Sequence, residues 1–203
     1  MQSIVQTFDA ALKVATDASK NAHSLDASGY YILPLGEREL ITQAAFVRMF
    51  VALEEFLEEA FGHYGMAGTS LNGNSFQCYS NAPTGDHFHN MLIGLNRFVD
   101  WSAPERVRKL AELYFPNGEP FATPLQSAHG ELLDMKTVRN AASHVSRTTS
   151  AQVTALYLRW TGQPSVSATA YEMLTSPGGQ NQQTFMSHAE KVLRATAQSI
   201  ANG

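Results

Sequence analysis

Residues 37–63 form the strongest helical pattern in the chain, and this pattern limits the fold more than any other feature. Apolar side chains recur at intervals of three and four residues along one face: Phe46, Phe50, Leu53, Leu57 and Phe61. Four further apolar residues widen that face: Leu40, Ala44, Val47 and Val51. A helix with so broad an apolar stripe is expected to be largely buried against neighbouring elements. The rest of the chain therefore has to supply packing partners for it.

Helical periodicity continues through most of the remaining sequence. Apolar residues at helical spacing, together with capping signals, predict helices over seven further ranges: 3–22, 87–99, 102–115, 127–145, 149–160, 169–175 and 182–201. Asp86, Ser102 and Thr149 are the predicted N-caps of three of them. Stretches rich in Gly, Pro, Ser and Asn predict the connecting loops: 23–36, 64–86, 116–126 and 162–168.

No range shows the alternation of a half-buried strand. Residues 30–33 are at best an isolated extended segment, because Pro34 follows them, and Pro177–Gly179 predicts a turn. The fold class is therefore all-α, a bundle of roughly five to seven helices. The length suits a single domain over 1–203, with the C-terminal helix, about 182–201, either part of it or an accessory element.

Cysteine content and hydropathy bear on the cellular setting. The single cysteine, Cys78, cannot form an internal disulfide and provides no ligand cluster for zinc, so a reducing cytoplasm is the simplest setting. The most apolar region, 44–61, is interrupted by Arg48 and four glutamates, so no membrane span is expected. The first four residues lack the basic flank and apolar run of a signal peptide. These features predict a cytoplasmic protein with no membrane partner.

Charge is distributed unevenly along a chain whose net charge is -4. Residues 1–60 hold nine acidic and four basic side chains, whereas 135–171 hold no acid and four bases: Lys136, Arg139, Arg147 and Arg159. A positive patch on an acidic protein would attract an RNA backbone, and Lys136 and Arg147 are its candidate RNA-binding residues. The alternative is that these cations pair with the acidic helix.

The segment 132–144 bears most directly on function and ends in Arg139-Asn140-x-x-x-His144. RNA can be cleaved without a metal when its 2′-hydroxyl attacks the neighbouring phosphate. A histidine moves the proton near neutral pH, because its ordinary pKa is about 6.5. An arginine presents a fixed fork of donors to the phosphate and its developing negative charge. Asn140 and His144 are four residues apart, so Asn140 can orient the imidazole.

The spacing of the two charged residues in this motif raises a geometric question. Arg139 and His144 are five residues apart, which places them roughly 140° apart around an ideal helix. A single straight helix therefore presents them poorly to one phosphate. Either the Arg139 side chain reaches round the helix, or the helix ends between the two residues.

This motif resembles the signature of the HEPN superfamily, in which an Arg, a polar residue that is often Asn, and a His lie close together. The upstream segment 50–57, Phe-Val-Ala-Leu-Glu-Glu-Phe-Leu, also resembles a helix of the HEPN branch found in bacterial defence and toxin loci. The resemblance implies a HEPN-like bundle with a metal-independent endoribonuclease activity and no cofactor. It also implies an RNA substrate, a homodimer whose two motifs face one cleft, and an antitoxin or sensor protein as a further partner. Glu54 matches the family's acidic position, which implies that it orients Arg139 or His144.

Other interpretations of the same residues stay open. The chain could be a non-catalytic HEPN module that binds a nucleotide or a protein. It could also be a structural helical protein whose motif is accidental, since a cation near a helix C-terminus suits the helix dipole. Glu54 could be a solvated acid among neighbouring glutamates. His87 and His89 resemble a metal-binding pair, but they fall at a loop–helix boundary and lack a third ligand, so no metal site is expected.

Overall fold

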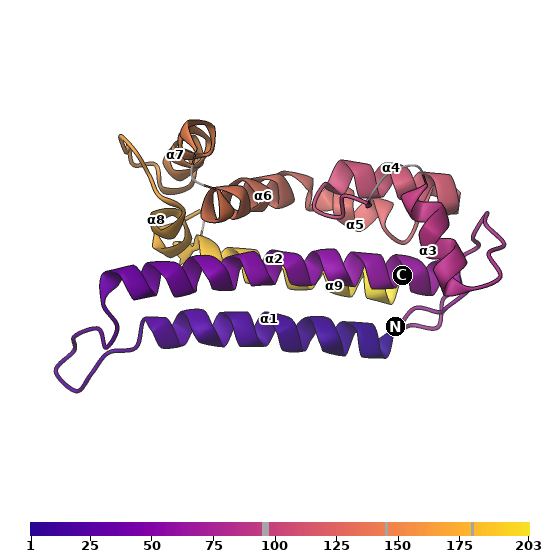
Figure 1. Cartoon of the computed structure of the whole chain (residues 1–203), viewed down its shortest axis with the longest axis horizontal. Coiled ribbons are helices and arrows are strands. Elements are labelled where there is room, and N and C mark those ends of the chain that lie inside the picture. The colour runs from indigo at the N-terminus through magenta and orange to yellow at the C-terminus, as the bar shows by residue number, and fades with distance from the viewer. Residues whose placement is uncertain (95–97, 145, 180) are drawn as a thin grey trace. The chain divides into compact units, whose positions relative to one another are not determined.

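The computed structural model describes residues 1–94, 98–144, 146–179 and 181–203, and it shows an all-α protein (Figure 1). The described residues form nine α-helices: α1 (Gln2–Ala22), α2 (Leu35–Gly65), α3 (Gly85–Ile93), α4 (Pro104–Tyr114), α5 (Ala122–Ser127), α6 (His129–Ser143), α7 (Arg147–Thr161), α8 (Ala170–Thr175) and α9 (Phe185–Asn202). The all-α prediction is confirmed, although the helices outnumber the five to seven expected. Residues 95–97, which fall in the predicted helix 87–99, lie outside the described residues.

Several short elements depart from the sequence predictions. All but the last residue of the helix α5 lies in the predicted loop 116–126, after the 3-10 turn Pro116–Gly118. Its Pro124 stands in the first turn, where no amide hydrogen is needed, and Leu125 is fully buried. The strands β1 (Pro177–Gly178) and β2 (Gln183–Thr184) pair antiparallel. The turn predicted at 177–179 is therefore wrong for the two residues of β1, and the helix predicted over 182–201 begins later, at Phe185, because β2 precedes it.

Two predicted N-caps are wrong because neighbouring residues begin the helices instead. Thr84, not Asp86, caps α3, and its hydroxyl accepts a hydrogen bond from a first-turn amide at 3.2 Å. Ala103 precedes α4 without a side-chain cap, while the hydroxyl of Ser102 donates to the Asp100 carboxylate at 2.5 Å. The Ser102 hydroxyl is thus engaged outside the helix that it was expected to cap.

The chain divides into two compact units, each built from separate segments. Unit 1 comprises Met1–Asp9, Ala52–Leu133 and Leu193–Gly203, and unit 2 comprises Ala10–Val51 and Asp134–Val192. The helices α1, α2, α6 and α9 contribute residues to both units. The C-terminal helix α9 supplies buried residues to each: Phe185 and Ala189 to unit 2, and Leu193, Ala197 and Ile200 to unit 1.

Unit 1 has an aromatic core around Phe61 of α2. Its ring lies between 4.9 and 6.3 Å, centroid to centroid, from five other rings: Phe88, Trp101, Tyr114, Phe115 and Phe121. Gly65, the last residue of α2, permits the approach of Phe88, since a Cβ at this position would lie 2.2 Å from that ring. The contact packs α3 on the end of α2. Aromatic clusters of this kind bury large areas and stabilise the unit.

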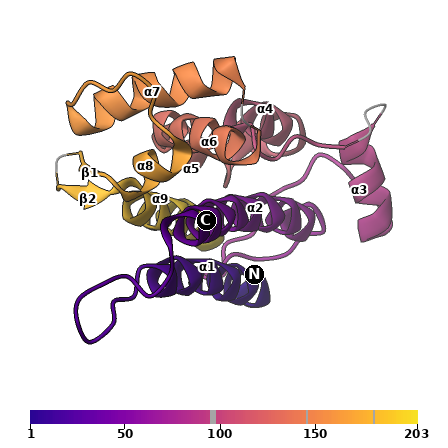
Figure 2. The same ribbon diagram turned by 60° about the vertical axis from the view of Figure 1, so that its left-hand side comes forward.

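Unit 2 packs α7, α9 and the β1–β2 ladder around Trp160 (Figure 2). The Trp160 ring meets Phe185 edge-on at 5.3 Å, and Phe185 in turn lies 6.2 Å from Phe46 of α2. The indole nitrogen of Trp160 donates to the Ser176 carbonyl at 3.2 Å. Gly178 of β1 lies so close that a Cβ there would be 2.4 Å from the Trp160 carbonyl oxygen. Only a residue without a side chain permits this packing.

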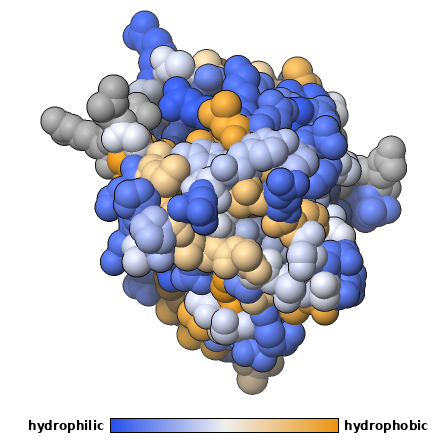
Figure 3. All heavy atoms as spheres, turned by 90° about the vertical axis from the view of Figure 1, so that its right-hand side faces the viewer, coloured by the Kyte–Doolittle hydropathy of each residue, from blue (hydrophilic) through white to orange (hydrophobic). Residues whose placement is uncertain are grey.

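The surface mixes polar and apolar residues. Figure 3 shows one face of the molecule, on which small groups of hydrophobic residues stand among hydrophilic ones. Within the described residues, no helix combines the length and hydrophobicity needed to cross a membrane. Exposed apolar residues of this kind are usual on the surfaces of folded proteins.

Candidate functional site

The Arg139–His144 motif lies at the C-terminal end of α6, in unit 2. The helix ends at Ser143, so His144 is the first residue beyond it, although its amide still donates to the Asn140 carbonyl at 2.8 Å. Arg139 and Asn140 are half-buried, whereas Ser143 and His144 are exposed. His144 is therefore the C-cap residue of α6, and its side chain still follows the angular spacing of the helix.

The Asn140 side chain contacts the arginine of the motif. Its Oδ1 accepts a hydrogen bond from Nη1 of Arg139 at 3.2 Å. The carboxamide of Asn140 therefore holds one nitrogen of the Arg139 guanidinium. The predicted role of Asn140 in orienting the His144 ring stays a prediction.

The turn that follows His144 is fixed by the start of α7. Ser146 is the N-cap: its hydroxyl accepts from the Thr149 amide at 3.2 Å, and Thr149 Oγ1 accepts from the Ser146 amide at 2.9 Å. The same Oγ1 lies 2.9 Å from the His144 carbonyl oxygen, to which it can donate. The prediction of Thr149 as the N-cap is thus wrong by three residues. Thr149 serves inside a capping box instead, and it holds the main chain of His144.

The cations of the acid-free stretch have different surroundings. Arg159 of α7 pairs with Asp134 of α6 at 2.5 Å, so it is paired, but with α6 rather than with the acidic helix α2. Lys136 is half-buried on α6, and Arg147 is exposed at the first position of α7. The RNA-binding roles of Lys136 and Arg147 stay predictions.

A cavity of about 270 Å³ opens beside the motif, and we call it the motif cavity. Its lining includes Ala141 of the motif and residues of α2, α7, the segment before α8 and α8 itself: Glu39, Gln43, Thr149, Ser150, Val153, Ser167, Ala168, Thr169, Ala170 and Tyr171. Four short polar side chains share this lining with four Ala or Val residues, and Glu39 brings a negative charge to it. A cavity with these polar groups can hold a planar ring that has hydrogen-bonding edges.

An apolar groove of about 340 Å³ lies on α2 next to Ala142, and we call it the α2 groove. Its apolar lining comes from the widened part of the stripe that the sequence predicted to be buried: Leu40, Ala44, Val47 and Val51. Leu40 is 69% exposed, and Ala44 is also exposed. The prediction that this side of the helix is buried is therefore wrong for Leu40 and Ala44.

Glu54 and the motif residues belong to different units of the chain. Glu54 is a half-buried residue of α2 within unit 1, whereas Arg139, Asn140 and His144 belong to unit 2. Its implied role in orienting Arg139 or His144 stays a prediction.

Residues with metal-binding side chains do not gather in the described part of the chain. Among residues 1–94, 98–144, 146–179 and 181–203, no three His, Cys, Asp or Glu side chains lie close enough to hold one ion. His89 contacts the Glu58 carboxylate at 3.5 Å, while His87 is exposed in the first turn of α3.

Two features of the site were missed from the sequence. The Ser146–Thr149 capping box had a partial signal, because Ser is a preferred N-cap residue, although the usual capping box has Glu or Gln where Thr149 stands. The motif cavity had none, since Gln43 and Tyr171 come from distant parts of the chain and meet only through packing.

No protein-family model, no curated protein and no solved structure matches this chain.

Proposed function

We propose that this protein is a HEPN-type endoribonuclease that cleaves RNA without a metal ion, as a homodimer in the cytoplasm. The observation that carries the proposal is the end of α6, where Asn140 holds one guanidinium nitrogen of Arg139 and His144 is exposed directly after the last helical residue. Because His144 is the C-cap residue, its side chain still follows the angular spacing of the helix, so the long Arg139 side chain or a second copy has to bring a guanidinium to the phosphate. A proton-transferring imidazole and a phosphate-binding guanidinium thus lie at one helix end.

The proposed reaction divides the work between these residues. His144 takes the proton of the 2′-hydroxyl, whose oxygen attacks the adjacent phosphorus, and the bond from phosphorus to the 5′-oxygen breaks. The 5′-oxygen takes up a proton from an imidazolium, which leaves a cyclic phosphate and a 5′-hydroxyl end. Arg139 donates to the phosphate oxygens as charge develops on them. Asn140 holds one guanidinium nitrogen and so limits the directions in which Arg139 can donate.

The motif cavity supports an RNA substrate, because it gives a base next to the reacting phosphate a place to bind. Gln43 and Ser150 offer both donors and acceptors to a base edge, and Tyr171 offers an aromatic ring. Arg147, exposed at the start of α7, and Lys136 are proposed to hold the backbone.

The α2 groove supports the homodimer, since it leaves apolar side chains exposed beside Ala142 of the motif. We propose that the occupant is a second copy of this chain. Two copies joined at this groove would bring their motifs to one interface, where Arg139 of one and His144 of the other could act on the same phosphate. A setting in phage defence or a toxin–antitoxin system, with an antitoxin or sensor protein as partner, belongs to the same proposal.

The test of catalysis is incubation of the purified protein with mixed RNA in EDTA. Wild type should cleave and leave cyclic phosphate ends, and His144→Ala should lower the rate by about 10²–10⁴-fold. His87→Ala is the matched control, because His87 is also exposed and lies in unit 1. Cleavage that stops in EDTA would contradict the metal-free mechanism. If neither protein cleaves any RNA, the non-catalytic HEPN module becomes the better proposal.

The dimer has its own test by analytical ultracentrifugation. Leu40→Glu places a charge in the α2 groove and should shift the protein from dimer to monomer with loss of cleavage. Leu113→Glu in α4 is the control, since Leu113 is similarly exposed, at 72%, and lies in unit 1. A wild-type protein that sediments as a monomer at all concentrations would contradict the dimer.

A further inference from the structure

The motif cavity has an acceptor-rich wall where α2 borders it. Glu39 and Gln43 both line the cavity, and they are four residues apart, so they lie on one face of the helix. Glu39 is half-buried, and within the described residues its carboxylate takes part in no hydrogen bond or ion pair. An ionised carboxylate only accepts hydrogen bonds, so this wall pairs with a ligand edge that donates them.

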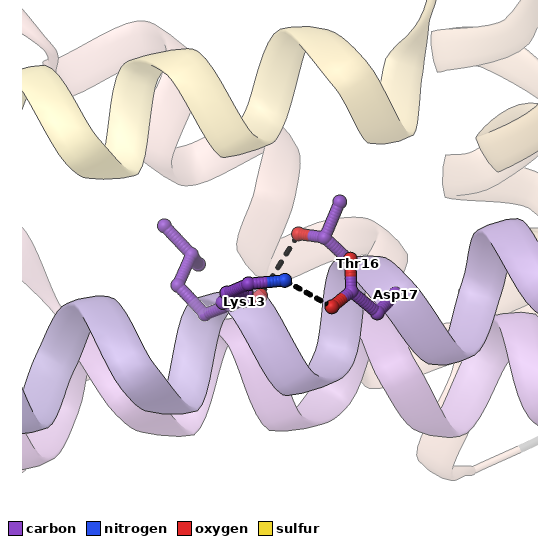
Figure 4. Close-up of polar contacts among 4 residues, drawn as sticks. Lys13, Thr16 and Asp17 are labelled. Carbon is purple, nitrogen blue, oxygen red and sulfur yellow. Dashed lines mark hydrogen bonds and ion pairs between the residues drawn. The ribbon is translucent and has the colours of Figure 1, made fainter.

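Two other carboxylates of unit 2 are bound by neighbouring cations instead. Asp17 of α1 accepts a hydrogen bond at 2.5 Å from Lys13, one turn earlier on the same helix (Figure 4), and this contact holds the pKa of Asp17 below its usual range. Asp134 is paired with Arg159. The carboxylate of Glu39 differs from both, because in the described part of the chain it has both oxygens left for a ligand.

The Gln43 side chain adds a donor to this wall. Its Nε2 donates one hydrogen to the Glu39 carbonyl oxygen at 3.3 Å, and a carboxamide nitrogen carries two hydrogens. One N–H of Gln43 therefore remains for a ligand in the described chain. The helix thus presents the two acceptors of Glu39 and, one turn further along, a donor of Gln43.

The rest of the wall suits the faces of a planar ring. Its apolar members are Ala141, Val153, Ala168 and Ala170. The volume of about 270 Å³ lies just below the range of about 300–1,000 Å³ that is usual for sites of drug-sized molecules, so it suits a single nucleobase. Tyr171 also lines the cavity, and its hydroxyl lies 3.2 Å from Nε2 of His23 and 3.5 Å from Arg38. These contacts hold the tyrosine before a ligand binds, which lowers the entropy cost of binding.

Thr149 connects the cavity to the motif. This residue lines the cavity, and its hydroxyl lies 2.9 Å from the carbonyl oxygen of His144. Ala141, which is inside the motif, lines the cavity as well. A base bound here therefore belongs to a nucleotide close to the phosphate on which His144 and Arg139 are proposed to act.

Guanine is the RNA base whose edge fits these groups. Its N1–H and its N2 amino group are neighbouring donors that can pair with the two oxygens of a carboxylate, as an arginine fork does, and its O6 can accept from the N–H of Gln43. Adenine and cytosine have a ring nitrogen that accepts beside their one amino group, and uracil has a carbonyl oxygen on each side of its one N–H. Each of these acceptors would be repelled by the Glu39 carboxylate.

From this chemistry we infer that the motif cavity selects guanine, so that the protein cleaves RNA at a phosphate next to guanosine. The inference rests on the proposed ribonuclease function and adds the base that the enzyme recognises. Glu39 determines this specificity, and Gln43 assists it. Neither residue takes part in the proton transfer or contacts the phosphate.

The first test measures the affinity of the wild-type protein for single nucleosides by NMR titration. Guanosine should bind about tenfold more tightly than adenosine, cytidine or uridine. Inosine is guanosine without the N2 amino group, and it should bind about tenfold more weakly than guanosine because one hydrogen bond to the carboxylate is lost. Equal affinity for guanosine and the other nucleosides would overturn the inference.

Glu39→Gln tests the residue itself. The variant keeps the size of the side chain but places an amide N–H against the donors of guanine, so guanosine binding should weaken by about tenfold while adenosine binding does not weaken. Glu37→Gln is the matched control, because Glu37 is exposed on the same helix and does not line the cavity. Thermal unfolding of Glu39→Gln near the wild-type temperature shows that the fold is kept. Equal guanosine affinity in Glu39→Gln and wild type would overturn the role of Glu39.

Sequencing of the ends produced from random RNA separates this inference from the proposed function. Wild type should cut next to guanosine, and Glu39→Gln should still cut, with that preference lowered about tenfold. Cleavage without base preference would overturn the inference and leave the nuclease proposal intact, and guanosine binding in the same protein would then assign the cavity to a free guanine nucleotide. Selective guanosine binding without any cleavage would support the guanine site and contradict the nuclease.

Discussion

The hydroxyl of Thr149, in the first turn of α7, lies 2.9 Å from the carbonyl oxygen of His144, the residue that follows α6. The Thr149 side chain makes both this contact and the capping box with Ser146. The orientation of the histidine main chain and the start of α7 therefore depend on the same residue.

Thr149→Val should destabilise the protein by about 1–2 kcal/mol, because valine keeps the shape but removes the cap and the contact to His144. Thr148→Val is the control, since Thr148 is exposed at the preceding position. The measurement is urea unfolding followed by circular dichroism. Equal midpoints for the two variants would show that the capping box contributes nothing.

Alkaline stability should depend on Tyr64. Burial raises the pKa of Tyr64 from its ordinary value of 10.0 to about 12, and its hydroxyl donates to the Ile200 carbonyl at 2.8 Å. The folded protein holds this proton more tightly than the unfolded chain does. The resulting stability is fully present below about pH 10 and is lost as the pH rises through about 12.

Tyr64→Phe should therefore remove part of the loss of stability seen above pH 10. Denaturant unfolding at a series of alkaline pH values measures it. Tyr79→Phe, at an exposed tyrosine of unit 1, should retain the wild-type pH dependence. If the stability of Tyr64→Phe falls above pH 10 as much as that of wild type, Tyr64 is not the source of the loss.

The ion pair between Arg159 and Asp134 should contribute little to stability. Both side chains are partly exposed, at 64% and 33%, and pairs in such positions are worth about 0.2–1 kcal/mol. A double-mutant cycle with Arg159→Met and Asp134→Asn should give a coupling energy in this range that falls as salt is added. A coupling energy above about 2 kcal/mol would mean that the pair is effectively buried.

Two glycine-to-alanine substitutions should change the stability of the protein in opposite directions. At Gly178 a Cβ would lie 2.4 Å from the Trp160 carbonyl, so alanine should destabilise the protein by about 1–3 kcal/mol through overpacking. At Gly62, inside α2, a Cβ meets nothing within 4 Å, so alanine should stabilise it by about 0.4–1 kcal/mol. Thermal unfolding of the two variants beside wild type tests both, and a shift of the same sign in both would contradict the argument.

The sequence predicted the helices best where one periodic pattern runs long. The helix predicted over 37–63 occurs as α2, Leu35–Gly65, because its apolar stripe extends over many turns. The helix α5 was missed, since its Pro and the nearby Pro and Gly residues are typical of loops, and its six residues are too few to show a helical apolar pattern. Capping was unreliable because several Ser, Thr and Asp residues compete within a few positions of each start.

The candidate site was predictable only in its local part. Arg139, Asn140 and His144 lie within six residues, so their placement near one helix end follows from the sequence, whereas the exposure of His144 and the hydrogen bond from Arg139 to Asn140 come from the structure. The cavities depend on packing between distant segments. His23 and Tyr171 are 148 residues apart, and their contact follows no pattern in the sequence.

The assembly of each unit from separate segments has a consequence for how the chain can be divided. No single cut yields a fragment that contains one whole unit and none of the other, because α1, α2, α6 and α9 each contribute residues to both. Neither unit can therefore be exchanged with another protein by one genetic crossover. Both ends of the chain, Met1–Asp9 and Leu193–Gly203, belong to unit 1, so truncation from either end damages unit 1 first and reaches unit 2 only when it is longer.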